Sequence, residues 1–301
     1  MKKFGLFVPT YRRKSPLILQ MLDKDPTLVI NLCVRHEEIV SGFYDELARQ
    51  HRVNIIDLGP GLTELGETRQ RILQHCIENK FDYCFMFDDG IFDVNDSENP
   101  DCSITDVFNR CIEIMQNDPL KEFVIGMTFT KRKFIDPVTG ELKTKRNRHL
   151  SETDRYFLVH AGQAIAIDVN HAVKFGIKYH SMEECGFEDA AFEGDAIKAG
   201  LVFCSRKAIS IDGVVPNAAK AGGSHHDNFD LEKKYDKHNI RCLEYLNMLG
   251  LSLRKKYVDY CHSYLSLIEW PFDYYRDVLV YHRDENKKII DSHFEIPEVE
   301  K

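Results

Sequence analysis

The feature that most constrains the fold is a regular alternation of apolar, β-rich runs with helical patterns over the first half of the chain. Short apolar runs bounded by turn signals are typical of buried strands. Strands are expected at residues 4–9, 28–34, 53–58, 83–87 and 123–129, and helices at residues 37–50, 64–80 and 103–117. This alternation predicts an α/β fold whose mostly parallel sheet is flanked by helices.

The second half of the chain has a different pattern. Residues 130–156 contain the turn signal DPVTG among basic residues and predict a β-hairpin or a mobile loop. We expect a strand at 157–167, a helix at 188–200 and a mainly helical, aromatic-rich segment at 231–283. Because single cores stop growing at roughly 250 to 300 residues, we predict a main domain at 1–228 with a helical C-terminal extension at 229–301.

The composition is that of a soluble globular protein, with 43% hydrophobic and 29% charged residues. No apolar run reaches the roughly 20 residues that cross a bilayer, and the N-terminus lacks the apolar core of a signal peptide. We therefore expect a cytoplasmic protein without a membrane span. The nine cysteines include no CxxC pair and are expected to be reduced. The net charge of −8 argues weakly against nonspecific nucleic-acid binding, although a local basic patch would still allow it.

Two adjacent acids, Asp88 and Asp89, directly follow the apolar run at 83–87. In an open α/β sheet, ligands bind beyond the carboxyl ends of the strands. Adjacent carboxylates repel each other unless a cation or hydrogen bonds neutralise them, and Mg²⁺ or Mn²⁺ does so while also binding phosphate oxygens. The same residues also suit an ordinary strand-ending turn, and the sequence leaves both interpretations open.

Two common nucleotide-binding motifs are absent from the sequence. No GxGxxG follows the first apolar run, which disfavours a dinucleotide-binding fold of the usual kind. No GxxxxGK[ST] phosphate loop is present either.

Several short motifs occur in an order that resembles a GT-A-fold nucleotide-sugar glycosyltransferase, most similar to the family 2 group. They are VPTYRR at 8–13, ETRQR at 67–71, FMFDDG at 85–90, HAGQA at 160–164, GFED at 186–189 and a histidine at 225 or 226. The resemblance covers roughly residues 4–226. The chain departs from the family pattern in having D-D-G in place of D-x-D and Gln70 in place of an asparagine.

The resemblance implies a metal-dependent, inverting transfer of a sugar from a nucleotide-diphosphate donor, with a UDP-sugar as the expected donor. It implies that Asp189, with Glu188 beside it, is the catalytic base. It also implies a divalent Mn²⁺ or Mg²⁺ held by Asp89 and by His225 or His226. The donor-binding residues that it implies are Pro9, Thr10, Tyr11, Arg13, Arg69, Asp88, Gly162 and Gln163.

Each of these residues also has a purely structural interpretation. Acids such as Glu188 and Asp189 are common at helix N-termini because the helix dipole stabilises them there. The arginines suit phosphate binding but are equally typical of a solvated surface, and the His225–His226 pair fits a solvated loop.

A basic segment is the one indication of the acceptor. It contains Lys131, Arg132, Lys133, Lys143, Lys145, Arg146 and Arg148. Such a run is often a solvated loop. The alternative is an anionic acceptor, which is either a phosphate-bearing glycan or lipid, or DNA with hydroxymethylated pyrimidines. The DNA option comes from the resemblance, because glycosyltransferases similar to this class are associated with DNA base hypermodification.

A second class of function stays open at this point. The chain also suits a noncatalytic nucleotide-binding or scaffold protein that keeps the fold. The aromatic tail at 257–282 lies outside the resemblance, and its role is left open.

Overall fold

The computed structural model describes residues 2–117, 122–135, 142–146, 155–157, 163–199 and 201–215, together with short pieces between 241 and 269. Its centre is a ten-stranded sheet with the order β3-β2-β1-β4-β9-β6-β10-β5, to which β7 is added beside β6 and β8 beside β10. The pairings β1–β2, β1–β4, β2–β3 and β6–β10 are parallel, whereas β9 is antiparallel to both of its neighbours, β4 and β6. The predicted α/β class with a mostly parallel sheet is thus confirmed.

The strands of this sheet alternate in sequence with helices only in its first part. The strands are β1 (Phe4–Pro9), β2 (Ile30–Val34), β3 (Val53–Asp57), β4 (Tyr83–Phe87), β5 (Ile91–Asp96), β6 (Glu122–Ile135), β7 (Leu142–Arg146), β8 (Arg155–Phe157), β9 (Ala164–Asp168) and β10 (Val202–Val215). The helices are η1 (Leu17–Gln20), α1 (Met21–Lys24), α2 (His36–Val40), α3 (Asp45–Gln50), α4 (Leu65–Glu78), α5 (Ile104–Asn117), α6 (Val169–Phe175), α7 (Met182–Cys185) and α8 (Glu188–Lys198).

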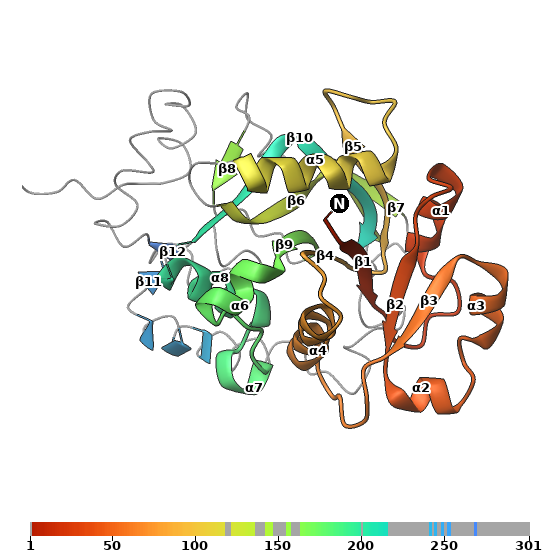
Figure 1. The fold of residues 1–301 in the computed structure, drawn as a ribbon, viewed down its shortest axis with the longest axis horizontal. Helices are drawn as coiled ribbons and strands as arrows, with labels where there is room; N and C mark the ends of the chain where they lie inside the picture. Colours follow the sequence, from red (N-terminus) through yellow and green to blue (C-terminus); the bar gives the residue numbers. More distant parts are fainter. Residues whose placement is uncertain are drawn as a thin grey trace, which may run out of the picture.

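Each face of the sheet has its own hydrophobic core. One core contains Phe85 and Phe108 and is covered by α5 and by the segment from η1 to α3. The other core contains Phe7 and Phe192 and is covered by α4, α6 and α8, as Figure 1 shows. Because helices cover both faces, ligand chemistry is confined to the edge where the strands end.

The prediction of one continuous helix at 37–50 is wrong. The segment forms two short helices, α2 and α3, and Gly42 lies between them with a φ of 67°. This left-handed backbone conformation suits glycine and interrupts a helix.

The strand expected at 157–167 is also wrong. Phe157 ends β8, which pairs with β10, whereas Ala164 begins β9, which pairs with β4 and β6. The sequence likewise gave no expectation of β5, because the acids in IFDVND weaken its apolar pattern. The expected hairpin within 130–156 is present as the paired strands β6 and β7.

Most of the predicted C-terminal extension lies outside the described residues, and the domain boundary at residue 228 stays a prediction. The described pieces include helical residues near 241–248 and two short paired strands, β11 (Ser252–Leu253) and β12 (Ile268–Glu269). Tyr245 contacts His180 and Asp195, so this segment packs beside α7 and α8. Within the described part of the chain, no helix has the length and apolar character needed to cross a membrane.

Candidate active site

Several of the predicted donor-binding residues come together at the edge where β1 and β4 end. Thr10 follows β1, and Asp88 and Asp89 follow β4. Because β9 is antiparallel to β4, its first residues lie at the same edge, and the carbonyl of Gln163 accepts a hydrogen bond from the N–H of Asp88 at 2.7 Å. The sheet topology thus brings together residues that are up to 153 positions apart in the sequence.

Asp89 is the inner of the two adjacent acids. It is 8% exposed, and its Oδ2 atom accepts a hydrogen bond from Thr10 Oγ1 at 2.9 Å and lies 2.8 Å from Arg13 Nε. Burial raises the pKa of Asp89, while Arg13 and Thr10 oppose this shift. These contacts connect the loop after β1 to the end of β4.

Asp88 is the outer acid, with 37% of its side chain exposed. One of its oxygens, Oδ1, lies 3.3 Å from Arg69. Burial away from water raises the pKa of Asp88. Arg69 opposes this shift, and the negative charge of the neighbouring Asp89 adds to it. Because its side chain still reaches solvent, Asp88 is better placed than Asp89 to meet a ligand.

Arg69 joins the two sides of the site. This guanidinium belongs to α4, is 4% exposed, and lies 3.4 Å from Glu188 on its other side. It also lies 5.9 Å from the centre of the Tyr179 ring. One buried cation therefore separates the acid that ends β4 from the acid that begins α8.

The two acids of the GFED motif differ in their environment. Glu188 is 5% exposed, and its pKa is raised to about 7 by burial and then by the neighbouring Asp189, while Arg69 opposes the shift. Asp189 is partly exposed, and its Oδ1 accepts the N–H of Ala190 at 2.8 Å. The geometry leaves Asp189 as the more accessible carboxylate of the pair.

The loop after β1 is held in an unusual conformation by a residue that the sequence analysis missed. Arg12 has a φ of 53°, which is rare for a residue with a side chain. The buried Glu38 accepts the N–H groups of Arg12 at 2.7 Å and of Arg35 at 3.2 Å, and Tyr44 donates its hydroxyl to it at 3.3 Å. No sequence signal separates Glu38 from the adjacent Glu37.

Arg35 also contacts the predicted donor residue Tyr11. The Arg35 guanidinium lies 4.1 Å from the centre of the Tyr11 ring, and that of Arg12 lies 5.0 Å from it. Beside them, His36 Nδ1 lies 2.8 Å from Asp57 Oδ2. The ends of β2 and β3 thus extend the polar edge, and their position after buried strands was a signal that sequence reasoning did not use.

Other predicted site residues lie elsewhere or cannot be placed. Lys131, Arg132 and Lys133 belong to β6 and Arg146 belongs to β7. Gly162, Arg148, His225 and His226 lie outside the described residues.

The described residues contain no group of three or more histidine, cysteine, aspartate or glutamate residues that could hold a divalent metal ion. Mg²⁺ and Mn²⁺, however, are commonly held by one or two carboxylates together with water and substrate phosphates. The partly exposed Asp88 fits that requirement, with Asp89 directly behind it.

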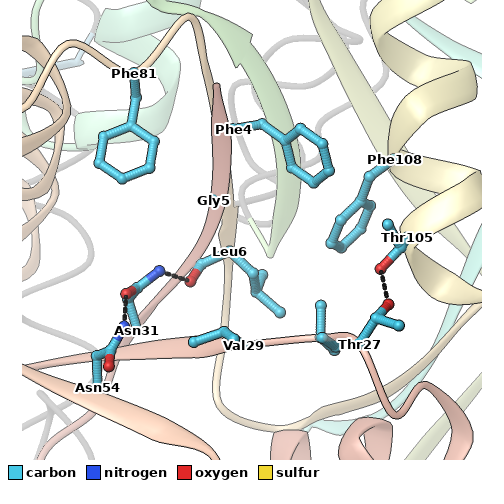
Figure 2. Close-up of a pocket in the computed structure, with 11 residues that line it drawn as sticks. Phe4, Gly5, Leu6, Thr27, Val29, Asn31, Asn54, Phe81, Thr105 and Phe108 are labelled. Carbon is cyan, nitrogen blue, oxygen red and sulfur yellow. Dashed lines mark hydrogen bonds between the residues drawn. The ribbon is translucent and has the colours of Figure 1, made fainter. Parts of the chain in front are cut away.

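A cavity of about 310 Å³ lies at the opposite end of the strands. Phe4, Phe81 and Phe108 line it, and Asn31 donates its amide to the Leu6 carbonyl, as Figure 2 shows. Its lining residues come from the start of β1, from β2 and β3, from the segments before β2 and β4, and from the start of α5, so it is separate from the polar edge.

No protein-family model and no curated protein matches the sequence. The structure is similar to that of the mannosyltransferase PcManGT from Pyrobaculum calidifontis in complex with GDP-Man and Mn²⁺, with 11% identity, a TM-score of 0.44, and coverage of 82% of this chain and 73% of that one. It is also similar to GalNAc-T7 with UDP, GalNAc and Mn²⁺, with 12% identity, a TM-score of 0.49, and coverage of 98% of this chain and 58% of that one.

A third similar structure is that of a putative nucleotide-diphospho-sugar transferase from Desulfovibrio desulfuricans. The identity is 11% and the TM-score 0.35, and the match covers 81% of this chain and 99% of that one. The donor, the acceptor and the activity of this chain are proposals that follow from its own residues.

Proposed function

We propose that the chain is a metal-dependent, inverting glycosyltransferase that moves a sugar from a nucleotide-diphosphate donor, with a UDP-sugar preferred, to an acceptor hydroxyl. The observation that carries the proposal is the position of Arg69 between Asp88 and Glu188 at the ligand-binding edge of the sheet. It supports a site with a diphosphate side and a base side, separated by a single buried guanidinium. Cytoplasmic location stays a prediction.

Asp88 is the proposed metal carboxylate. The sequence favoured Asp89 for this role, but Asp89 contacts both Thr10 and Arg13, whereas the Asp88 side chain reaches solvent. When it is bound, Mn²⁺ or Mg²⁺ stabilises the negative charge on the diphosphate leaving group. Asp89 then fixes Thr10 and Arg13, the residues that the resemblance assigns to donor binding.

The proposed transfer is a single displacement. The bond between the sugar anomeric carbon and the diphosphate oxygen breaks, and its electron pair leaves with the diphosphate. A bond between the same carbon and the acceptor oxygen forms, and the hydroxyl proton passes to the Asp189 carboxylate. Glu188 has a positioning role, because it is buried against Arg69 rather than facing a ligand.

The test is release of nucleoside diphosphate from a panel of nucleotide sugars, with and without Mn²⁺. We expect metal-dependent release from one donor, which is lost in Asp88→Asn and reduced in Asp189→Asn. Asp101→Asn is the matched control, because Asp101 is exposed and lies in the turn between β5 and α5. Donor binding without release by the unchanged protein would instead favour the noncatalytic nucleotide-binding function.

A further inference from the structure

Gln70 is the residue of the ETRQR motif that departs from the family pattern, and it is not among the residues proposed to bind the donor or to act as the base. It lies on α4 directly after Arg69 and is partly exposed. Its Oε1 atom accepts a hydrogen bond from the backbone N–H of Tyr179 at 2.8 Å. The two residues are 109 positions apart in the sequence, so this bond joins distant parts of the chain.

Further contacts join α4 to residues 179–182, termed here the linking segment. Glu64, which precedes α4, accepts the N–H of Met182 at 2.7 Å. At Gly66 the backbone carbonyl oxygen of His180 comes so near that an added Cβ atom would lie 2.1 Å from it. Gly66 lies one helical turn before the glutamine, so both contacts are on the same face of the helix. The linking segment therefore lies along one face of α4.

The linking segment also contacts α8. The Tyr179 ring stacks on that of Phe192, with the ring centres 4.2 Å apart and an angle of 7° between the planes. Both of these side chains are buried. In addition, His180 Nε2 lies 2.7 Å from Asp195 Oδ2. The linking segment is thus held between α4 and α8.

These two helices carry the two sides of the proposed site, and both cover the same face of the sheet (Figure 1). Arg69 lies on α4 and contacts Asp88, the proposed metal carboxylate, whereas Glu188 and Asp189 begin α8. The linking segment is held on α4 through its own backbone groups, so a change of side-chain rotamer within it does not alter the spacing. A displacement of about 1 Å between reacting groups can lower a rate about 100-fold.

From these contacts we infer that Gln70 is a positioning residue. Its hydrogen bond to the linking segment sets the place of α8, and thereby of the Asp189 carboxylate, relative to the donor side of the site. Gln70 does not touch the donor in this role. The inference rests on the proposed glycosyltransferase function, because the proton transfer to Asp189 is the step that requires this spacing.

The role depends on the length of the Gln70 side chain and on its acceptor atom. Asparagine, the residue of the family pattern, is one methylene shorter and leaves the Tyr179 N–H without this acceptor. Glutamate has the same length as glutamine and accepts the same N–H, whereas methionine has a similar length and only a weak acceptor. A direct contact to the donor through the amide N–H groups would give a different order of activities, because glutamate has no N–H in its ionised side chain.

The experiment measures release of nucleoside diphosphate from the nucleotide sugar of the panel that the unchanged protein cleaves. We expect kcat to fall about tenfold or more in Gln70→Met and Gln70→Asn, while the KM for the donor stays within about twofold, because the donor side is not displaced. Gln70→Glu should keep kcat within about threefold of the unchanged protein. Gln74→Met, one turn further along α4 and exposed, is the matched control.

A double-mutant cycle tests whether the effect passes through Asp189. In the Asp189→Asn background, Gln70→Met should lower kcat by less than about twofold, because the group that it misplaces has already lost its function. A general weakening of the fold would instead lower kcat by the same factor in both backgrounds. Such an additive result would overturn the positioning role.

Hydrogen exchange tests the contact itself and needs no donor. The Tyr179 amide and the first amides of α8 should exchange faster in Gln70→Met than in Gln70→Glu. The inference is overturned by unchanged exchange in Gln70→Met, by unchanged kcat in that variant, or by a rise in KM at constant kcat. If the unchanged protein cleaves no donor, the proposed function fails and the positioning role with it, whereas the exchange result still shows whether Gln70 holds the linking segment.

Discussion

The guanidinium of Arg69 lies 3.4 Å from a carboxylate oxygen of Glu188, and both side chains are almost completely buried. The same guanidinium contacts Asp88 at 3.3 Å. A buried charge is tolerated when it is paired, and removal of one partner leaves the other uncompensated. Arg69 therefore contributes to the stability of the fold as well as to the arrangement of the site.

Arg69→Met should lower the free energy of unfolding by about 3 kcal/mol at neutral pH, because Glu188 then loses its cation inside the protein. The loss should be smaller at pH 5, since Glu188, with a pKa of about 7, is then protonated and carries no charge. Chemical denaturation at the two pH values measures both effects. Arg49→Met on the exposed side of α3 is the control and should change little. Equal losses at both pH values would contradict the coupling to Glu188.

Asp88 and Asp89 should respond differently to the same substitution. Asp89→Asn weakens contacts to Thr10 and Arg13 and should destabilise the protein by about 2 kcal/mol. Asp88→Asn should lower the free energy of unfolding by less than about 1 kcal/mol, because the Asp88 side chain is partly exposed. The same change should abolish the rise in melting temperature that Mn²⁺ causes in the presence of UDP. Thermal unfolding with and without metal and nucleotide measures both. A metal response that is lost only in Asp89→Asn would reverse the assignment.

The sequence predicted the polar edge because its signal is local. Asp88 and Asp89 follow an uninterrupted apolar strand, and the position of such residues in an α/β sheet follows from the topology. The split of residues 157–167 between β8 and β9 could not be predicted, because it depends on which distant strands each half pairs with. Glu38 was missed for a similar reason, since its role arises from backbone N–H groups presented by two different loops.

Glu193 is a buried acid whose stability effect should depend on pH. It is 1% exposed, and its Oε2 atom has no hydrogen-bond partner among the described residues. Burial, with a further contribution from Asp189, raises its pKa well above the usual 4.5. Above pH 4.5 the unfolded chain releases this proton while the folded protein keeps it, so stability falls as pH rises, by at most about 1.4 kcal/mol per pH unit.

Glu193→Gln removes this proton linkage. We expect the variant to match the unchanged protein near pH 5 and to exceed its free energy of unfolding by about 1–3 kcal/mol at pH 8. Denaturant titrations across that range measure the difference, and Glu113→Gln on the exposed face of α5 is the control. A constant difference at all pH values would show that Glu193 is ionised in the folded protein.

Gly66 permits the close approach of α4 to the segment before α7. A Cβ atom at this position would lie 2.1 Å from the backbone carbonyl oxygen of His180 and 3.0 Å from the Cβ of Glu188. Gly66→Ala should destabilise the protein by about 2 kcal/mol, because the clash with backbone outweighs the better helix propensity of alanine. Calorimetry of this variant beside Gln74→Ala, on the exposed side of α4, tests the clash. An increase in stability would show that the two segments are farther apart.

Tyr245 connects the described part of the C-terminal segment to the main sheet domain. Its hydroxyl donates to Asp195 Oδ1 at 2.8 Å and lies 2.8 Å from His180 Nε2, which is itself 2.7 Å from Asp195 Oδ2. Tyr245→Phe removes the hydroxyl that bonds to these partly buried groups, and it should lower the free energy of unfolding by about 1–2 kcal/mol.

The same segment also makes a solvent-exposed ion pair. Arg241 lies 3.8 Å from Glu183, whose side chain is 82% exposed, so Arg241→Ala should change stability by less than about 0.5 kcal/mol. Hydrogen exchange should show faster exchange of residues 241–249 in Tyr245→Phe and not in Arg241→Ala, because only the first variant removes a contact that is shielded from water. The reverse order of the two variants would mean that charge, rather than the Tyr245 hydroxyl, holds this segment against α8.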